Sequence, residues 1–177
     1  IVLDACRPDL LAEVADDYAF LSTAVNTYDS PASQSEEWME KTFGAASPAD
    51  REQTAYVTGN PFSRSLDASE FARLDEVWRY AWDDEFGGIP PAPVTDRAIT
   101  AGRETDAERL IVHYMQPHVP FRSGAFDAGH TLDAAIDGDD VGKYVWYELR
   151  DGEVSLDELW DAYRDTLRWV LDSVGTL

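Results

Sequence analysis

Residues 110–121 have the sequence LIVHYMQPHVPF, and this stretch decides the fold. It begins with an apolar run at residues 110–112, typical of a strand buried on both faces of a parallel sheet. Two prolines further on remove two backbone donors and prevent a helix, which predicts an ordered loop. His113 and His118, two of the chain's three histidines, lie here. Open α/β sheets place their sites outside the carboxyl ends of strands, so both are site candidates, unless they are only hydrogen-bonded packing residues.

The start of the chain shows a similar pattern. Residues 1–3 are apolar and Asp4 follows them, which predicts a strand that ends in a carboxylate. Pro8 then suits the first turn of a helix. A carboxylate at the carboxyl end of a strand is well placed to bind a metal ion or to act in catalysis. The alternative is that Asp4 caps the following helix.

Ser33 and Glu36 have the S-x-x-E spacing of a capping box, ahead of a predicted helix that runs to about Phe43. Capping is the simplest role for Ser33. A hydroxyl at a helix N-terminus also lies at the positive end of the helix dipole, among free N–H groups. A nucleophile that attacks a phosphate or sulfate ester would be placed there.

Hydrophobic periodicity and cap residues predict the remaining elements. Strands are expected at 20–25 and 54–58, and helices from Thr95 to about Ala107, at 141–149 and from a Ser155–Glu158 capping box through Val174. Residues 74–82 and 145–147 are compatible with helix or strand, and 123–140 are expected to form a surface excursion. Alternating strands and helices predict one α/β domain over residues 1–177, with a mostly parallel sheet and helices on both faces.

Composition limits the class of protein. The 177 residues include 14 Lys and Arg against 35 Asp and Glu, a net charge of −21. Such a surface repels nucleic acids and anionic membranes, so neither is expected as a partner. An aromatic content of 12% favours a packed core over disorder. An acidic chain with only two lysines, Lys41 and Lys143, indicates adaptation to high salt, where ions screen the repulsion.

Other features of the sequence concern the cellular setting. A single cysteine, Cys6, excludes an internal disulfide and fits a reducing compartment, so a cytoplasmic location is expected. The sequence contains no signal peptide and no apolar run of about 18 residues, so no membrane segment is expected. Because the first residue is Ile1 rather than methionine, the chain is interpreted as a piece of a longer protein.

Two motifs carry a resemblance to a known family. Residues 4–9, DACRPD, resemble the D-x-x-R-x-D segment that ends the first strand of sulfatases in the alkaline phosphatase superfamily. Residues 113–121, HYMQPHVPF, are similar to their H-Y-M-x-P-H-x-P-[YF] segment. Residues 161–177 resemble the helix that precedes their D-H-G-E metal motif. The resemblance spans nearly the whole chain and implies a three-layer sandwich whose C-terminal part is missing here.

The resemblance also implies a function. It implies hydrolysis or transfer at a sulfate or phosphate ester, carried by a small molecule or a glycan. A divalent metal ion (Ca, Mg, Mn or Zn) would be bound by Asp4 and by a later Asp-His pair. His118 matches the family histidine near the ester, and His113 is a second candidate, to protonate the leaving group or orient its neighbour. Ser33 is the candidate nucleophile, and Arg7 and Ser35 are candidates for binding the ester.

The chain departs from the family pattern at two points. Sulfatases form their nucleophile from the cysteine of C-x-P-S-R, whereas residues 33–37 are SQSEE, in which Glu36 and Glu37 would repel an anion. The 177 residues contain no D-H-G-E segment, so half of the metal ligands that the resemblance implies are expected to lie outside this sequence. The alternative is therefore a protein of the same fold that has lost its chemistry and serves as a binding or assembly module.

The acidic composition predicts that folding depends on salt. With a net charge of −21 the compact state repels itself until ions screen the charges, so the melting temperature should rise from dilute buffer to molar KCl. Thermal unfolding followed by circular dichroism at the two salt concentrations measures this. A melting temperature that does not move would reject adaptation to high salt.

Overall fold

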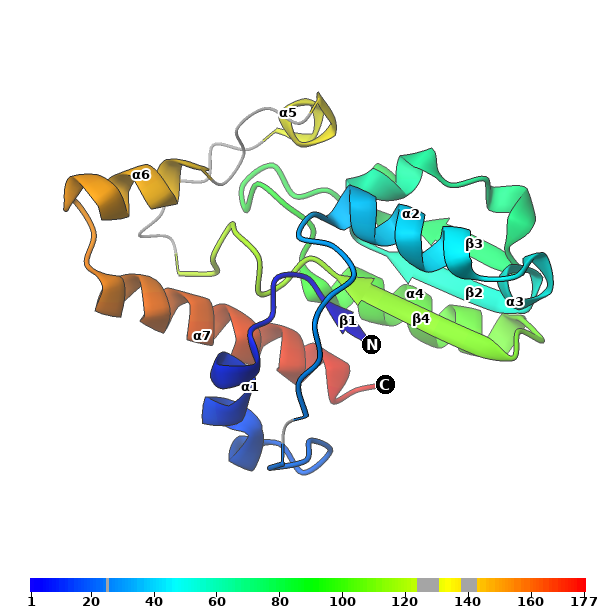
Figure 1. Cartoon of the computed structure of the whole chain (residues 1–177), viewed down its shortest axis with the longest axis horizontal. Coiled ribbons are helices and arrows are strands. Elements are labelled where there is room, and N and C mark those ends of the chain that lie inside the picture. The colour runs from blue at the N-terminus through cyan, green and yellow to red at the C-terminus, as the bar shows by residue number, and fades with distance from the viewer. Residues whose placement is uncertain (25, 124–130, 138–142) are drawn as a thin grey trace.

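A four-stranded, all-parallel sheet forms the centre of the molecule, in the strand order β1-β4-β2-β3 (Figure 1). The computed structural model describes residues 1–24, 26–123, 131–137 and 143–177. The strands are β1 (Val2–Leu3), β2 (Thr54–Thr58), β3 (Arg73–Glu76) and β4 (Arg109–Tyr114). This confirms the predicted α/β fold with a parallel sheet, and it confirms the predicted strands at 54–58 and 110–112.

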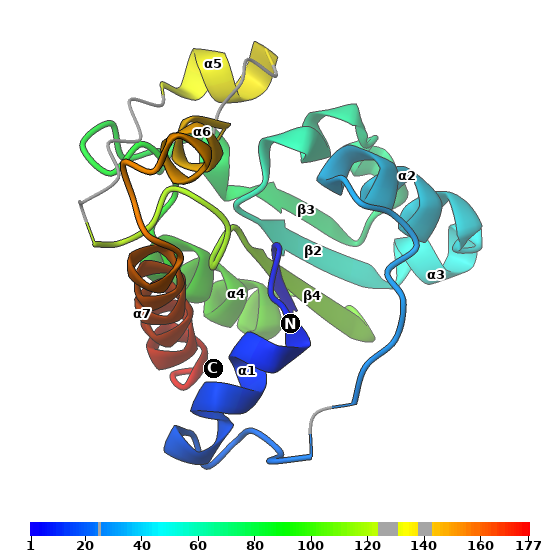
Figure 2. The same cartoon turned by 60° about the vertical axis from the view of Figure 1, so that its left-hand side comes forward.

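Helices cover both faces of the sheet (Figure 2). On one face, α2 contributes Met39 and Phe43, which pack with Tyr56 of β2. On the other, α4 and α7 pack against Val57 and Val112 of the two central strands. The helices are α1 (Pro8–Val14), α2 (Ser35–Ala45), α3 (Pro48–Glu52), α4 (Pro91–Glu104), α5 (Leu132–Asp137), α6 (Lys143–Asp151) and α7 (Leu156–Val174). Short 3₁₀ turns are η1 (Ala15–Asp17), η2 (Pro61–Ser65), η3 (Ala68–Glu70) and η4 (Val77–Arg79).

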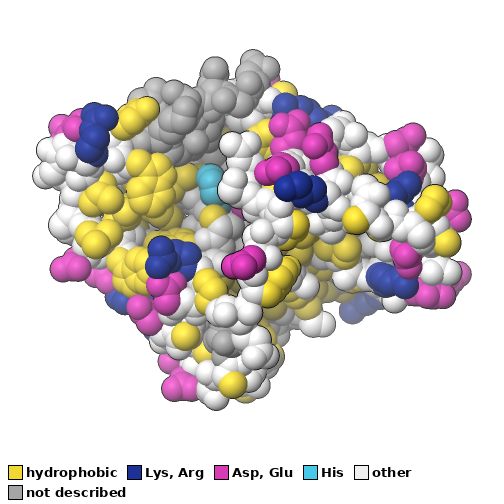
Figure 3. Space-filling view, viewed as in Figure 1, with side chains coloured by type: hydrophobic (Ala, Val, Ile, Leu, Met, Phe, Trp, Pro, Cys, Tyr) yellow, Lys and Arg dark blue, Asp and Glu magenta, His cyan; other side chains and the backbone are white. Residues whose placement is uncertain are grey.

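The long helix α7 begins as the sequence predicts. Ser155 Oγ accepts a hydrogen bond from the Glu158 backbone N–H at 3.2 Å, and the Ser155 N–H donates to Glu158 Oε2 at 2.9 Å, which completes a capping box. An apolar stripe that includes Leu167 then packs into the core. Figure 3 shows that an apolar area remains exposed on the side of the molecule where α6 and α7 lie. Among the described helices, none combines the length and apolarity needed to cross a membrane.

The strand predicted at residues 20–25 is wrong for the part that is described. Residues 20–24 form a turn and a bend, and Phe20 is 49% exposed. Among the described residues of this segment, only Leu21 packs against the main core cluster. A strand inside a parallel sheet is buried on both faces, and Phe20 and Leu21 followed by Ser22 and Thr23 are too few apolar residues to fill them. Val25 lies outside the described residues.

The helix predicted from Thr95 begins four residues earlier, at Pro91, and ends at Glu104. Proline favours the first helical turn because its φ is preset and its missing N–H would have no intrahelical partner there. Thr95 therefore lies inside α4, where its buried hydroxyl pairs with Tyr114 Oη at 2.7 Å. It ties α4 to β4 and does not act as a cap.

Two segments that the sequence left open are now assigned. Residues 74–82 divide into the end of β3 and the 3₁₀ turn η4, so neither a continuous helix nor a continuous strand is present. Residues 143–151 form helix α6, which confirms the predicted helix over its described part; residues 141–142 lie outside the described residues. Most of the predicted excursion at 123–140 also lies outside them, apart from residue 123 and a segment that contains α5.

Two leucines of α7 allow a matched test of this packing. Leu167 is fully buried in the main core, whereas Leu156 on the same helix is 62% exposed. Leu167→Ala should lower the free energy of unfolding by about 2–5 kcal/mol through lost burial and a cavity. Leu156→Ala should change it by less than about 0.5 kcal/mol. Urea denaturation of both variants measures the difference, and equal losses would contradict the core position of Leu167.

Candidate functional site

Asp4 lies at the carboxyl end of β1, at the edge of the sheet where β2 and β4 also end. Its backbone N–H extends the ladder by donating to the Tyr114 carbonyl oxygen at 3.1 Å. The next residue, Ala5, has φ 57°, a left-handed conformation that is uncommon for a residue other than glycine. The Tyr163 hydroxyl donates to the Ala5 carbonyl and holds this turn. Strained backbone of this kind is concentrated at functional sites, so the conformation of Ala5 supports the neighbouring Asp4 as a site residue.

Two side chains donate hydrogen bonds to one oxygen of the Asp4 carboxylate. Ser35 Oγ and Asn60 Nδ2 each lie 2.8 Å from Asp4 Oδ2. His113 Nε2 lies 3.9 Å from the same oxygen. The Asp4 side chain remains 16% exposed, so the carboxylate is held firmly and is still reachable from solvent. Residues as far apart in the sequence as Asp4 and His113, 109 positions, thus meet at one carboxylate. The carboxyl ends of parallel strands lie at the same edge of the sheet, which brings such residues together.

Ser35 is the first residue of α2, and Gln34 is the N-cap without a side-chain cap. The capping box predicted for Ser33 and Glu36 is therefore wrong. The helix begins one residue later than that box requires, with the Ser35 hydroxyl directed to Asp4. The first N–H groups of α2 have no intrahelical partner, so Ser35 lies at the positive end of the helix. Ser33 is exposed in the preceding loop, and its predicted catalytic role stays a prediction.

Asn60 was not among the residues selected from the sequence. It follows β2, is fully buried, and accepts a hydrogen bond from the Phe62 N–H at 2.9 Å while its amide nitrogen donates to Asp4. The order Gly59-Asn60-Pro61 is a common turn sequence, which explains why it was interpreted as a turn alone. A polar side chain directly after a fully buried strand was the signal that could have identified it.

His113 lies inside the protein on the α2 side of β4. It is 2% exposed, its Nδ1 pairs with Tyr56 Oη at 2.7 Å, and the Trp38 ring meets it edge-on at 5.5 Å. Burial lowers the pKa of His113, and the nearby Asp4 charge opposes this only in part. The ring is therefore neutral at neutral pH, and its position suits contact with Asp4 better than proton exchange with solvent.

His118 is connected to Asp4 through the backbone. Its N–H donates to the carbonyl oxygens of Asp4, at 3.2 Å, and Met115, at 3.0 Å. Its ring Nδ1 lies 2.7 Å from the Val119 carbonyl oxygen and must be the donor, which makes Nε2 the acceptor when the ring is neutral. The loop is held further by Gln116 Nε2, which donates to the Ile89 carbonyl, and both of its prolyl peptide bonds are cis. These contacts place the His118 loop beside the Asp4 backbone.

Arg7 follows the Ala5 turn in the sequence. Its guanidinium forms two hydrogen bonds with Asp9, at 2.9 and 2.6 Å, and lies over the Trp160 ring at 5.4 Å. The pair is exposed, and such ion pairs contribute little to stability. The predicted role of Arg7 in binding an ester stays a prediction. Burial, with a smaller effect of Asp9, raises the pKa of the neighbouring Cys6 to about 11, so this thiol is not a reactive nucleophile.

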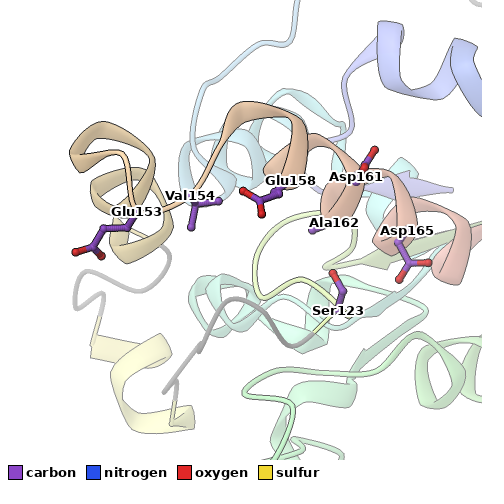
Figure 4. A pocket seen from close by; sticks show the side chains of 7 residues that line it. All are labelled: Ser123, Glu153, Val154, Glu158, Asp161, Ala162 and Asp165. Carbon is purple, nitrogen blue, oxygen red and sulfur yellow. The ribbon is translucent and has the colours of Figure 1, made fainter.

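A hollow whose lining does not include Asp4 lies at the surface of α7 (Figure 4). Its volume is about 520 Å³, and it is lined by Ser123, Glu153, Val154, Glu158, Asp161, Ala162 and Asp165. Two of its four acidic side chains have structural partners, since Glu158 completes the α7 capping box and Asp161 pairs with Arg164. The acidic lining of this hollow repels an anionic ester.

The comparisons with known proteins leave the family open. No protein-family model matches the chain, and comparison with curated proteins and with solved structures finds no significant match. The resemblance to sulfatases therefore rests on the motifs in the sequence.

The described residues offer only part of a metal site. They contain no group of three or more His, Cys, Asp or Glu side chains that could hold a metal ion. Asp4 supplies one carboxylate, with the Ser35 hydroxyl beside it. A Mg²⁺ or Ca²⁺ ion needs about six oxygen ligands, usually with more than one carboxylate. The fit to a divalent metal ion is therefore partial.

We expect metal binding to be weak for the same reason. Isothermal titration with Mg²⁺, Ca²⁺, Mn²⁺ or Zn²⁺ should give a Kd no tighter than roughly millimolar. Asp4→Asn should remove the specific part of the heat, whereas Asp16→Asn, which deletes an equal charge at an exposed position, should leave it unchanged. Micromolar affinity for any of these ions would show that the chain already holds a complete ligand set. The description of Asp4 as the single carboxylate of a partial site would then be wrong.

Proposed function

We propose that Asp4, Ser35 and Asn60 belong to the site of a sulfatase-like, metal-dependent hydrolase or transferase that acts on sulfate or phosphate esters. The observation that carries the proposal is the 2.8 Å contact between Ser35 Oγ and the Asp4 carboxylate, at the first residue of a helix. A hydroxyl that donates to a carboxylate and lies among free backbone N–H groups has the environment of an activated nucleophile facing an anion.

In this proposal Ser35, rather than Ser33, is the attacking residue. Asp4 Oδ2 accepts the Ser35 proton in a hydrogen bond and fixes the direction of the oxygen lone pairs. The first N–H groups of α2 donate to the non-bridging oxygens of the ester, where charge develops during attack. His118, held beside the Asp4 backbone by its own N–H, is the residue proposed to protonate the leaving group.

Charge explains why a cation belongs to the proposal. The first turn of α2 carries two exposed carboxylates, Glu36 and Glu37. Together with Asp4 they repel an incoming sulfate or phosphate. A divalent ion that takes Asp4 as one ligand would offset this repulsion and neutralise the ester oxygens. The described residues contain no group of three or more His, Cys, Asp or Glu side chains that could complete its coordination.

The second candidate is a catalytically inactive module of the same fold. The partial metal site favours it, because one carboxylate alone does not support metal-assisted hydrolysis. The Ser35–Asp4 contact favours the enzyme, because a binding module has no need of a serine hydroxyl directed at a strand-end carboxylate.

The experiment is a steady-state assay of the protein at its natural length with aryl phosphate and aryl sulfate, in the presence of a divalent metal ion. Ser35→Ala and Asp4→Asn should each lower kcat/KM about 10²-fold or more. Ser30→Ala, which removes an exposed hydroxyl from the loop before α2, is the matched control and should have no effect. A larger loss from Ser33→Ala than from Ser35→Ala would assign the nucleophile to Ser33, and absence of all turnover would favour the binding module.

A further inference from the structure

The His113 ring lies between a tyrosine hydroxyl, which can donate or accept a hydrogen bond, and a carboxylate, which can only accept one. Nδ1 lies 2.7 Å from the Tyr56 hydroxyl oxygen, and Nε2 lies 3.9 Å from Asp4 Oδ2. The latter distance is too long for a direct hydrogen bond, so the contact with Asp4 is electrostatic. The Trp38 edge and the Tyr56 ring pack against the imidazole, and a ring flip would put carbon atoms where Nδ1 and Nε2 now lie, with loss of the hydrogen bond to Tyr56.

Only one of the two nitrogens carries a proton. The His113 side chain is 2% exposed and has no carboxylate of the described residues within hydrogen-bond distance, and a buried imidazole in that setting is neutral, with one N–H donor and one acceptor. Burial also raises the pKa of Tyr56, so the phenol keeps its proton and can donate. The position of the ring proton is therefore decided by the two neighbours of the ring.

The two possible arrangements differ in what faces the carboxylate. With the proton on Nδ1, the Nε2 lone pair would face the Asp4 oxygen, and two negative partial charges would oppose each other in a buried setting. With the proton on Nε2, Tyr56 donates to Nδ1 and the ring N–H points its positive end at Asp4. The second arrangement gives each acceptor a donor.

We propose that Tyr56 fixes His113 as the Nε2–H tautomer, so that His113 is a positioning residue that presents a ring N–H to the Asp4 carboxylate. Ser35, Asn60 and His113 then direct three positive hydrogen-bond donors at a single oxygen, Oδ2. Asp4 is thereby held in one orientation. The consequence for turnover rests on the proposed function, whereas the tautomer itself does not.

Nitrogen-15 NMR of the histidine rings tests the tautomer directly. The chain has three histidines, so a spectrum of protein labelled at the ring nitrogens is simple, and His113→Gln identifies the His113 signals by their loss. We expect a protonated Nε2 and an unprotonated Nδ1 in the wild-type protein. Tyr56→Phe, which removes the donor, should convert this single form into a mixture of both tautomers.

The chain provides a matched control in Tyr114. Like Tyr56 it is fully buried in a central strand and its hydroxyl makes a 2.7 Å hydrogen bond, but that bond goes to Thr95 on the opposite face of the sheet. Tyr114→Phe should cost comparable stability and leave the His113 spectrum unchanged. A protonated Nδ1 in the wild-type protein would overturn the proposal, as would an unchanged tautomer in folded Tyr56→Phe.

The functional arm uses two isosteric replacements. The amide nitrogen of glutamine can take the place of Nε2, whereas asparagine reaches only the place of Nδ1. In the protein at its natural length, His113→Asn should lower kcat on an aryl phosphate about 10- to 100-fold with little change in KM, as the loss of a group that orients a ligand does. His113→Gln should recover most of that loss. Equal losses in both variants, with the expected NMR result, would leave the tautomer in place but remove its role in turnover; no turnover in any variant would instead refute the proposed function.

Discussion

The pairing of β1 with β4 is the interaction on which the rest of the site depends. Only two residues of β1 take part, with Val2 opposite His113 and Leu3 opposite Tyr114. This short ladder is extended at its carboxyl end by the Asp4 N–H, which donates to Tyr114, and by the Asp4 carbonyl, which accepts from His118. Both contacts involve backbone groups, so they fix the position of Asp4 whatever its side chain does. The side-chain donors from α2 and from the end of β2 then find the carboxylate already in place.

Asp75 and Asp4 are protected carboxylates that are stabilised in different ways. Asp75 of β3 is 7% exposed and lies between Arg73 and Arg97, so its charge is balanced by guanidinium groups. The hydrogen-bond donors to Asp4 are neutral: a hydroxyl and an amide. Paired charge is the usual solution for a buried carboxylate, whereas neutral donors keep the negative charge available. In a chain with a net charge of −21, this difference separates a carboxylate that holds the fold together from one that can attract a cation.

The sequence predicts the parts of the structure that depend on local patterns. The two central strands, the α7 capping box and the strand-end position of Asp4 all follow from periodicity and cap chemistry. Asn60 was not predicted, and Ser35 was predicted to bind the ester but not to contact Asp4, because both side chains are positioned by a carboxylate far away in the sequence. The shift in the start of α2 has the same origin. The S-x-x-E spacing favours Ser33 as the N-cap, but the hydrogen bond from Ser35 to Asp4 places the first helical residue at position 35. The predicted strand at 20–25 failed because hydrophobic residues alone do not specify pairing.

The left-handed backbone at Ala5 has a consequence for how this sequence can vary among relatives. A β-branched residue is poorly tolerated in that conformation, whereas glycine, asparagine and aspartate adopt it readily. Position 5 should therefore accept a small or polar residue in any homologue that keeps the same turn, however hydrophobic its surroundings. An isoleucine or valine there would mark a lineage in which the carboxylate at position 4 is no longer aimed in the same direction. One backbone angle thus provides a criterion for recognising which distant relatives share this site.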